Sequence, residues 1–348
     1  MSTSNQSQIF DLEFLDKCPI CNSEKLKQIY HKVEDRIFFT PGAWNVFRCG
    51  SCFSGVLNPR PTALTIKNAY REYYTHAPTQ VEVVNSISLK NKIFKKFADS
   101  YREYKFSSDI KLLSRLISAA AFFAPMQRLR IEAGMRNLPT HSFGKQLLDI
   151  GCGGGDFLLL AKKVGWDVIG VDPDPKAVDV AQKKGIKVFL GGIEALNNEE
   201  YGEKFDYITL SHVIEHVHNP ISLLKDCYRL LKKGGIIWIE TPNFNSLGLK
   251  HYGSSWRGLE VPRHLVLFNR ISLESILKIS GFSSIVDAPY RPLCLAMFEA
   301  SEIIAAGIDN LEAVKSSKKT TSMAKKAENQ CQKNVNIREF ITIKATKK

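Results

Sequence analysis

Four of the eight cysteines stand in two closely spaced pairs, Cys18-Pro-Ile-Cys21 and Cys49-Gly-Ser-Cys52. Two CxxC pairs can surround one Zn²⁺ with four thiolates, and a closed set of this kind leaves no coordination position for a substrate. The alternatives are a redox dithiol, for which one pair is enough, and coincidence. We therefore predict that Cys18, Cys21, Cys49 and Cys52 are the ligands of a structural zinc.

Two short motifs combine histidine with charged neighbours, Glu215-His216-Val217-His218 and Pro262-Arg263-His264. An unperturbed imidazole titrates near pH ~6.5, so a histidine can remove a proton at neutral pH. A guanidinium can hold an anionic group through paired hydrogen bonds. We predict His216 as the catalytic base and His264 as the second candidate, with Glu215 and Arg263 beside them. The alternative is that Glu215 and His264 only hold their loops by hydrogen bonds.

A glycine-rich turn, Gly151-Cys152-Gly153-Gly154-Gly155, follows an apolar run and precedes a helical pattern. A strand–turn–helix of this kind brings backbone N–H groups close to a ligand. The dinucleotide pattern needs a further glycine where Asp156 stands, and the GK[ST] phosphate loop is absent. Asp172 ends the next apolar run, where a carboxylate can bind two ribose hydroxyls. The pattern favours a cofactor without a pyrophosphate at this turn over ordinary turn glycines.

These motifs closely resemble the class I S-adenosylmethionine-dependent methyltransferases. The resemblance rests on DIGCGGGDF, VIGVDPDP, the glycine pair before Ile193 and FDYITLSHVIEHVHNP, and it covers roughly residues 146–290. It implies methyl transfer as the activity, S-adenosylmethionine as the cofactor, the ribose at Asp172 and the adenine near Ile193 and Glu194. The implied cofactor contacts are Asp149, Gly151, Cys152, Gly153, Asp172, Pro173, Ile193, Glu194, Ser211 and His212.

The order of the motifs narrows the resemblance. A Cys₄ ribbon, then FSGVLNPRPT with a tyrosine-rich helix, then the methyltransferase core is similar to bacterial methyltransferases of sugar and surface-polysaccharide pathways. This implies a hydroxyl of a sugar, nucleotide sugar or polysaccharide precursor as acceptor, with an anionic group held by Arg263. One alternative is an RNA methyltransferase that grips phosphates with the ribbon and the basic tail. Others are a quinone or lipid O-methyltransferase, since the EHV stretch resembles that of quinone O-methyltransferases, and a cofactor-binding regulator without catalysis.

From residue 146 to 242 short apolar runs alternate with helical segments, which predicts a parallel sheet with crossover helices. The expected fold is therefore α/β, a Rossmann-like seven-stranded methyltransferase sheet with helices on both faces. We expect a zinc ribbon at residues 1–62, with short strands at 33–40 and 44–48, and a helical linker on the acceptor side at 63–140. The methyltransferase domain would fill 141–348. In it a loosely ordered basic excursion at 301–337 precedes an antiparallel last strand at 339–344.

Composition limits the classes of partner. The formal charge is +13, but residues 314–348 contribute +8 of it (ten Lys/Arg, two Glu), which leaves +5 for the rest. This distribution does not favour a nucleic-acid-binding body. No apolar stretch reaches the ~18–20 residues of a membrane span, and the first residues lack the basic start and apolar core of a signal peptide. We expect a cytoplasmic protein with a small-molecule or carbohydrate acceptor, with peripheral membrane contact left open.

Overall fold

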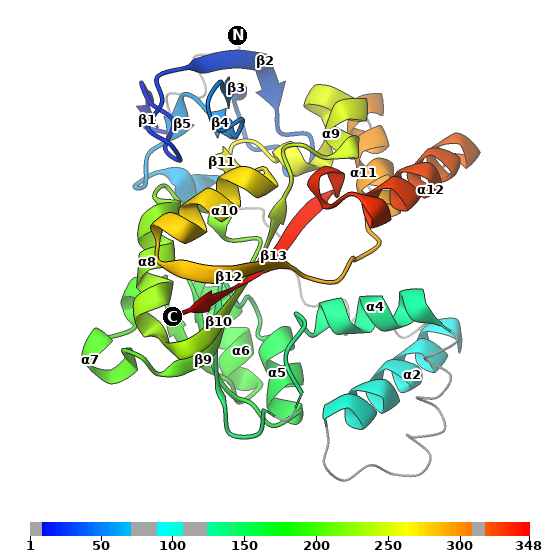
Figure 1. The fold of residues 1–348 in the computed structure, drawn as a ribbon. Coiled ribbons are helices and arrows are strands. Elements are labelled where there is room, and N and C mark those ends of the chain that lie inside the picture. Colours follow the sequence, from blue (N-terminus) through cyan, green and yellow to red (C-terminus); the bar gives the residue numbers. More distant parts are fainter. Residues whose placement is uncertain (1–8, 71–88, 107–123, 141, 308–316) are drawn as a thin grey trace.

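The computed structural model describes residues 9–70, 89–106, 124–140, 142–307 and 317–348, drawn in colour in Figure 1. Its centre is a seven-stranded sheet in the order β12-β13-β10-β9-β6-β7-β8. The strands from β6 to β10 run parallel, and β13 pairs antiparallel with both β10 and β12. The strand bounds are β6 Gln146–Ile150, β7 Asp167–Asp172, β8 Lys187–Leu190, β9 Phe205–Ser211, β10 Leu231–Pro242, β12 Phe282–Asp287 and β13 Phe340–Lys347. The predicted α/β fold is confirmed, including the antiparallel last strand.

Alternate residues of each central strand face two separate cores, as the two-residue period of a strand requires. Leu147 belongs to a core with α5 and α6, whereas its neighbour Leu148 belongs to a core with α8 and α10. Tyr207 and Ile208 divide in the same way. Helices therefore cover both faces of the sheet. Their bounds are α5 Asp156–Lys163, α6 Pro175–Lys183, α8 Pro220–Leu230 and α10 Arg270–Ile279, with the short α7 at Asn198–Tyr201.

The helix ends are fixed by local chemistry. Asn219 caps α8 by accepting a hydrogen bond from the backbone N–H of Ser222, with Pro220 at the first helical position. Asn269 and Ser272 form a reciprocal capping box at the start of α10. The sheet and these caps hold the loops at the carboxyl ends of the strands.

The N-terminal ribbon consists of two small antiparallel sheets. One pairs β1 (Leu12–Glu13) with β5 (Arg60–Pro61), and the other has the order β11-β4-β3-β2. Its strands are β2 Leu26–Glu34, β3 Ala43–Cys49, β4 Gly55–Leu57 and β11 Val266–Leu267. The strand predicted at residues 33–40 is wrong, because the first long strand of the hairpin is residues 26–34. β11 belongs by sequence to the methyltransferase region, so the ribbon sheet contains strands from both parts of the chain.

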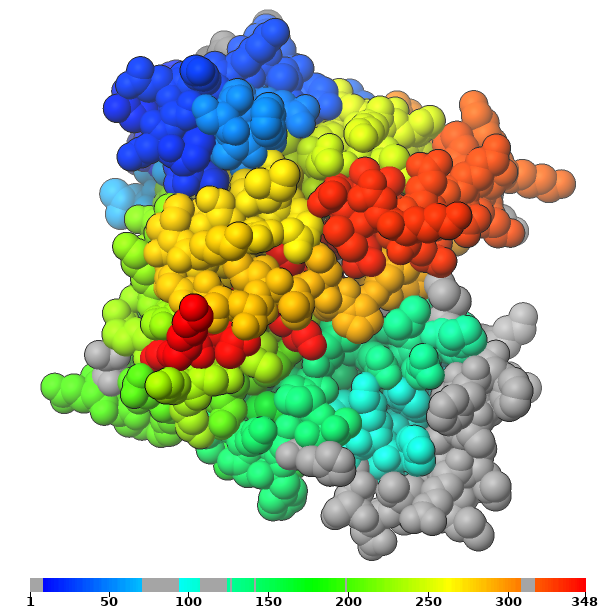
Figure 2. Space-filling view, viewed as in Figure 1, coloured from blue at the N-terminus to red at the C-terminus, as the bar shows by residue number. Residues whose placement is uncertain are grey.

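The ribbon lies against the side of the molecule where the central strands end. In Figure 2 the blue ribbon packs directly on the yellow part of the chain, which contains β11 and α10. Backbone hydrogen bonds join the two parts, with Leu57 N–H donating to the carbonyl of Leu265 at 3.1 Å. Phe244, after β10, lies so close to Gly55 that a Cβ at Gly55 would meet its ring at 2.7 Å. The ribbon therefore packs closely on the segment before β11 and on the residues after β10.

Two further groups of helices complete the described structure. In the linker, α2 (Leu89–Phe106) and α4 (Pro125–Gly134) contact each other through Tyr101 and Glu132. The remaining helices are α9 Leu247–Tyr252, α11 Cys294–Ala306 and α12 Lys318–Lys333, with 3₁₀ turns η1 Ile66–Tyr70, η4 Ile193–Ala195, η5 Ile214–His216, η6 Gly253–Ser255, η7 Arg257–Leu259 and η8 Val335–Ile337. Within the described residues, no helix has both the length and the apolar character needed to cross a bilayer.

The expectation of a loosely ordered excursion at residues 301–337 is wrong for most of that stretch. α11 and α12 lie together at one flank of the molecule (Figure 1) and share a small core. The buried members of that core are Cys294, Phe298, Ala324, Ala327 and Cys331. The small buried side chains of α12 allow the two helices to approach closely. The lysine-rich composition of residues 301–337 did not indicate this packing.

Candidate active site

The glycine turn between β6 and α5 lies beside the carboxyl end of β7. Gly151, Gly153 and Gly155 all adopt left-handed backbone angles, with φ of 68°, 53° and 77°. The N–H of Gly153 donates to one oxygen of Asp172 at 2.7 Å, and the N–H of Asp174 donates to the other at 2.9 Å. No described atom lies within 4 Å of the position that a Cβ of Gly153 would take. The turn therefore presents open backbone beside a fixed carboxylate, which suits the ribose and methionine parts of S-adenosylmethionine.

Asp172 is almost fully buried, and this burial raises the pKa of its carboxyl group above the ordinary value. The two backbone N–H donors act in the opposite direction. Each carboxylate oxygen has a second lone pair, so both keep acceptor capacity for a ligand hydroxyl. Pro173 follows directly and turns the chain toward α6.

Cys152 faces the core. Its side chain packs under the turn so closely that a Cβ at Gly170 would lie 2.6 Å from its sulfur. Its N–H donates to the carbonyl of Val171. The side chain of Cys152 therefore supports the turn from the core side.

Asp149 lies below the turn, and its partner was not predicted from the sequence. The Arg136 guanidinium, which follows α4, forms an ion pair with Asp149 and donates to Thr209 Oγ1 at 2.9 Å. It also lies 3.9 Å from the centre of the Phe157 ring. The Oδ2 atom of Asp149 is buried without a hydrogen-bond partner among the described residues. A cation and an unpaired carboxylate oxygen at this place fit the amino-acid end of the cofactor.

Burial raises the pKa of Asp149, while Arg136 and Thr209 lower it in part. Arg136 gave no signal in the sequence because it stands outside the sheet motifs, at a left-handed φ of 47° after a helix. A search for a basic residue shortly before the first strand could have found it.

The residues implied for the adenine side follow β8. Ile193 is buried in the turn η4, and the N–H of Gly192 donates to Glu194 Oε1 at 2.8 Å. A Cβ at Gly192 would lie 2.5 Å from the other Glu194 oxygen. Glu194 therefore folds back over its own loop at the same edge of the sheet as Asp172.

Ser211 ends β9 beside β10, and His212 follows it. The imidazole of His212 lies between two buried carboxylates, with Nδ1 3.3 Å from Glu215 and Nε2 3.6 Å from Glu240. Burial lowers the pKa of His212, but the hydrogen bonds to Glu215 and Glu240 outweigh it, so the pKa is raised. Arg291 pairs with Glu240 at 2.9 Å. A charged network therefore connects β9, β10 and the chain after β12.

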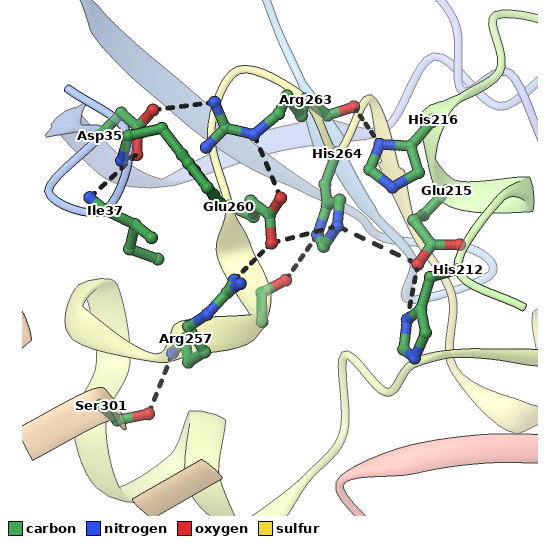
Figure 3. Close-up of polar contacts among 12 residues, drawn as sticks. Asp35, Ile37, His212, Glu215, His216, Arg257, Glu260, Arg263, His264 and Ser301 are labelled. Atoms are coloured by element: carbon green, nitrogen blue, oxygen red, sulfur yellow. Dashed lines mark hydrogen bonds and ion pairs between the residues drawn. The ribbon is translucent and has the colours of Figure 1, made fainter. Parts of the chain in front are cut away.

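Glu215, His216 and His264 come together from the two predicted motifs (Figure 3). One ligand atom from each lies within 4.8 Å of the other two, and the two imidazole rings are 4.7 Å apart between centres. Glu215 is fully buried and accepts a hydrogen bond from Thr241 Oγ1 at 3.0 Å. Burial raises the pKa of Glu215, but the contacts with His212 and the other imidazoles lower it to about 2. Burial lowers the pKa of His264 to about 4.

Arg263 does not reach an acceptor. Its side chain is fully buried and pairs with Asp35 of the ribbon at 2.9 Å and with Glu260 at 3.1 Å. It also donates to Thr40 Oγ1 and the carbonyl of Ala69. The prediction that Arg263 holds an anionic acceptor is therefore wrong, because its polar atoms fasten the ribbon to the loop of His264.

The linker and the ribbon both touch this cluster. Tyr70 Oη lies 2.9 Å from His216 Nδ1. His218 Nε2 lies 2.9 Å from the carbonyl of Pro61. Tyr70 thus contacts His216, whereas Tyr73 and Tyr74 lie outside the described residues.

The four predicted zinc ligands converge in the ribbon. All four sulfur atoms lie within 4.8 Å of one another, with Cys18 to Cys52 at 3.6 Å and Cys21 to Cys49 at 3.5 Å. Four thiolates at about 2.3 Å from one ion would have sulfurs separated by roughly 3.8 Å. The donor set and its spacing therefore fit Zn²⁺.

Residues 122–286 match the family model described as "Methyltransferase domain". Two curated relatives are ubiquinone biosynthesis O-methyltransferases. The one from Shewanella halifaxensis is 33% identical over 108 residues, covering 30% of this chain and 46% of the relative. The one from Cereibacter sphaeroides is 35% identical over 119 residues, covering 32% and 48%. The chain spans about half the length of the curated relatives it matches.

Solved structures with a similar fold include a SAM dependent methyltransferase from Archaeoglobus fulgidus. It is 24% identical, with a TM-score of 0.43, over 65% of this chain and 99% of that one. Phosphoethanolamine N-methyltransferase 2 from Haemonchus contortus, in complex with S-adenosyl-L-methionine, is 18% identical. Its TM-score is 0.44 over 84% and 62% of the two chains. The family match confirms the predicted methyltransferase domain.

Proposed function

We propose, from the S-adenosylmethionine-dependent methyltransferase domain that this chain carries, that it transfers a methyl group to a hydroxyl oxygen of a small acceptor. The observation that supports this proposal is the arrangement at one edge of the sheet. There the open glycine turn with Asp172 lies beside the strand end that is followed by Glu215 and His216. Open α/β sheets bind their ligands at this edge.

The chemistry of the side chains suggests which part of S-adenosylmethionine each would contact. Asp172 would accept from the ribose hydroxyls, Ile193 would pack against the adenine, and Arg136 with Asp149 would hold the amino-acid end. When bound, S-adenosylmethionine supplies a sulfonium methyl group whose carbon bonds to the acceptor oxygen as the carbon–sulfur bond breaks and its electron pair stays on sulfur. The chain then has to align the acceptor and remove the hydroxyl proton.

For the acceptor, the relatives favour the quinone alternative over the sugar prediction. The curated proteins above are named for O-methylation in ubiquinone biosynthesis. We therefore place a phenolic hydroxyl of a quinone precursor first. Sugar hydroxyls are the competing class in the acceptor test below.

Glu215, His216 and His264 would provide the polar side of the acceptor site. Two ways of activating the hydroxyl use the same three residues. Either an imidazole of His216 or His264 takes the proton, or a cation held by the cluster lowers the pKa of the hydroxyl. Both ways require the cluster. Loss of turnover in His216→Ala and His264→Ala would show that the cluster is required, whichever of the two ways operates.

The zinc of the ribbon is proposed as a structural ion. Cys18 and Cys49 are fully buried and the four sulfurs form a closed set. Such a set leaves no open coordination position for a substrate. The ion would hold the ribbon in the shape that covers the acceptor side.

The cofactor proposal is tested by calorimetric titration of the full chain with S-adenosylmethionine and, separately, with NAD. We expect micromolar binding of the first and none of the second. The acceptor proposal is tested by mass spectrometry of reactions with dihydroxybenzoates, quinols and nucleotide sugars. A product one methyl group heavier with a phenolic acceptor supports the first class, and one with a nucleotide sugar supports the other. Absence of S-adenosylmethionine binding would overturn the assignment of the glycine turn.

A further inference from the structure

We propose that Glu215, His216 and His264 bind a divalent transition-metal ion beside the acceptor, separate from the zinc of the ribbon. The three residues offer one carboxylate oxygen and two imidazole nitrogens within 4.8 Å of one another. His264 Nε2 and Glu215 Oε1 are 4.0 Å apart, a gap that one ion about 2.1 Å from each can bridge. Ion binding stands on this geometry alone, whereas its role toward the acceptor rests on the proposed function.

Both histidines are oriented as metal ligands are. His216 Nδ1 lies 3.1 Å from the carbonyl of Arg263, and His264 Nδ1 lies 2.8 Å from the carbonyl of Gly258. A carbonyl only accepts, so each Nδ1 carries the proton and each Nε2 presents its lone pair. Tyr70 Oη, 2.9 Å from His216 Nδ1, then accepts from the same N–H. Backbone carbonyls that fix the other ring nitrogen are the usual second partners of metal-bound histidines. Figure 3 shows the His216 ring held in this way, with its second nitrogen toward Glu215.

The surroundings of His264 Nε2 suit a cation. This atom faces Glu215 at 4.0 Å and Glu260 at 3.9 Å, and all three side chains are buried. Both separations exceed a hydrogen bond, so a proton on Nε2 would reach neither carboxylate. The lone pair of Nε2 therefore faces two carboxylates without a proton between them. An ion coordinated by Nε2 and Glu215 bridges the 4.0 Å gap between them, which a single proton cannot.

The side chains around Glu215 and Glu260 show which of these two carboxylates can be a metal ligand. Glu260 pairs with Arg257 and Arg263, so its charge is already neutralised. Glu215 is held by Thr241 Oγ1 on one oxygen, while the other oxygen faces His212 and His264. Glu260 thus serves to hold the loop through its two arginines. Glu215 has an oxygen available to be the third ligand beside the two imidazoles.

The donor set indicates the kind of ion. Two imidazoles and one carboxylate suit Zn²⁺, Fe²⁺, Co²⁺ or Mn²⁺, whereas Mg²⁺ and Ca²⁺ prefer oxygen ligands. Three protein ligands leave at least one coordination position open, in contrast to the closed Cys₄ set. An acceptor hydroxyl bound there would lose its proton to solvent more readily because the ion stabilises the oxyanion. His216 and His264 would then act as ligands and neither would be the free base.

The test counts ions in the full chain. Wild type, Glu215→Gln, His264→Gln and the surface control His31→Gln are equilibrated with Zn²⁺, dialysed and analysed for metal. We expect two ions per chain in wild type and in H31Q, and one in E215Q and H264Q. The zinc retained on the cysteines shows that the variants still fold. One ion in wild type, or two in both E215Q and H264Q, overturns the site.

Cobalt and turnover complete the test. Co²⁺ bound to thiolates gives intense charge-transfer absorption, and Co²⁺ bound to imidazoles and a carboxylate does not. H264Q should therefore lose one Co²⁺ and keep the full charge-transfer absorption. Mild chelation of wild type should lower turnover at least about tenfold, with recovery on adding Zn²⁺ or Mn²⁺. Unchanged turnover with only the cysteine-bound ion present refutes the role of the second ion. Binding of two ions without methyl transfer to any acceptor leaves the site standing and refutes the proposed function.

Discussion

The guanidinium of Arg263 and the carboxylate of Asp35 form an ion pair of 2.9 Å in which both side chains are buried. Asp35 also accepts backbone N–H groups of Ile37, Phe38 and Thr40 at 3.1 Å, so it fixes the loop between β2 and β3. Arg263 directly precedes His264. The pair therefore connects the ribbon to the polar cluster of the acceptor side (Figure 3).

Replacing Arg263 by lysine should destabilise the protein. Lysine keeps the charge but cannot serve Asp35, Glu260, Thr40 and the carbonyl of Ala69 together. Loss of one partner from a buried ion pair lowers the free energy of unfolding by about 3–5 kcal/mol. Because lysine keeps the charge, we expect a decrease of about 2–4 kcal/mol. Urea unfolding measures the change. Arg229→Lys, in a partly exposed pair with Asp226, should change the free energy of unfolding by less than about 1 kcal/mol. Equal effects of the two substitutions would contradict a special role for Arg263.

The sequence was sufficient for the central sheet because each of its signals is local. The apolar run ending in Ile150, the left-handed glycines and the cap at Asn219 each depend on a few neighbouring residues. The same holds for the convergence of Cys18, Cys21, Cys49 and Cys52, which two short spacings already indicate. The position of Asp172 follows from the length of one strand and one helix.

The parts that could not be predicted depend on contacts between distant residues. β11 pairs with β4 across more than 200 residues, and Arg263 meets Thr40 across 223. Nothing near Arg263 in the sequence indicates that its partner is Asp35, so an acceptor-binding role was equally consistent with its type. Arg136 is recognisable only once Asp149 and Thr209 are seen beside it.

Substituting Asp172 by asparagine should weaken binding of S-adenosylmethionine. The amide keeps one acceptor oxygen, whereas Gly153 N–H and Asp174 N–H use both oxygens of the carboxylate. We expect about a 10- to 100-fold increase in the dissociation constant, or roughly 1.4–2.7 kcal/mol, measured by calorimetric titration. Asp167→Asn lies at the opposite end of the same strand and should leave the affinity unchanged. An unaltered dissociation constant in D172N would remove Asp172 from the cofactor site.

Removing the zinc of the ribbon should reduce turnover although its ligands do not touch the acceptor. Cys49→Ser should lose one equivalent of metal, and the loosened ribbon should release β4 from β11 and Asp35 from Arg263. We expect turnover to fall at least about tenfold, because ligand positioning within about 1 Å decides rates. Metal analysis and turnover are measured on the same sample. Cys227→Ala, a buried cysteine in α8, should keep the full metal content, and full turnover in zinc-depleted C49S would contradict the proposed positioning.

Glu339 should make the stability of the protein depend on pH. It is buried at the start of the last strand and accepts hydrogen bonds from Gly248 N–H at 2.7 Å and Trp256 Nε1–H at 3.0 Å. Burial raises the pKa of Glu339 to about 7, against the two hydrogen bonds that lower it. Because the folded-state pKa lies above the unfolded value of ~4.3, the folded protein binds this proton more tightly. The stabilisation is therefore complete below about pH 4 and is lost as the pH rises through about 7.

Glu339→Gln removes this titration while keeping the shape of the side chain. The difference in free energy of unfolding between wild type and E339Q should change by about 3 kcal/mol between about pH 4 and pH 8, with wild type losing relative stability as the pH rises. Urea unfolding at a series of pH values measures it. The exposed control Glu199→Gln should follow wild type at every pH. A constant difference between wild type and E339Q would mean that Glu339 is ionised throughout, with its charge held by Gly248 and Trp256.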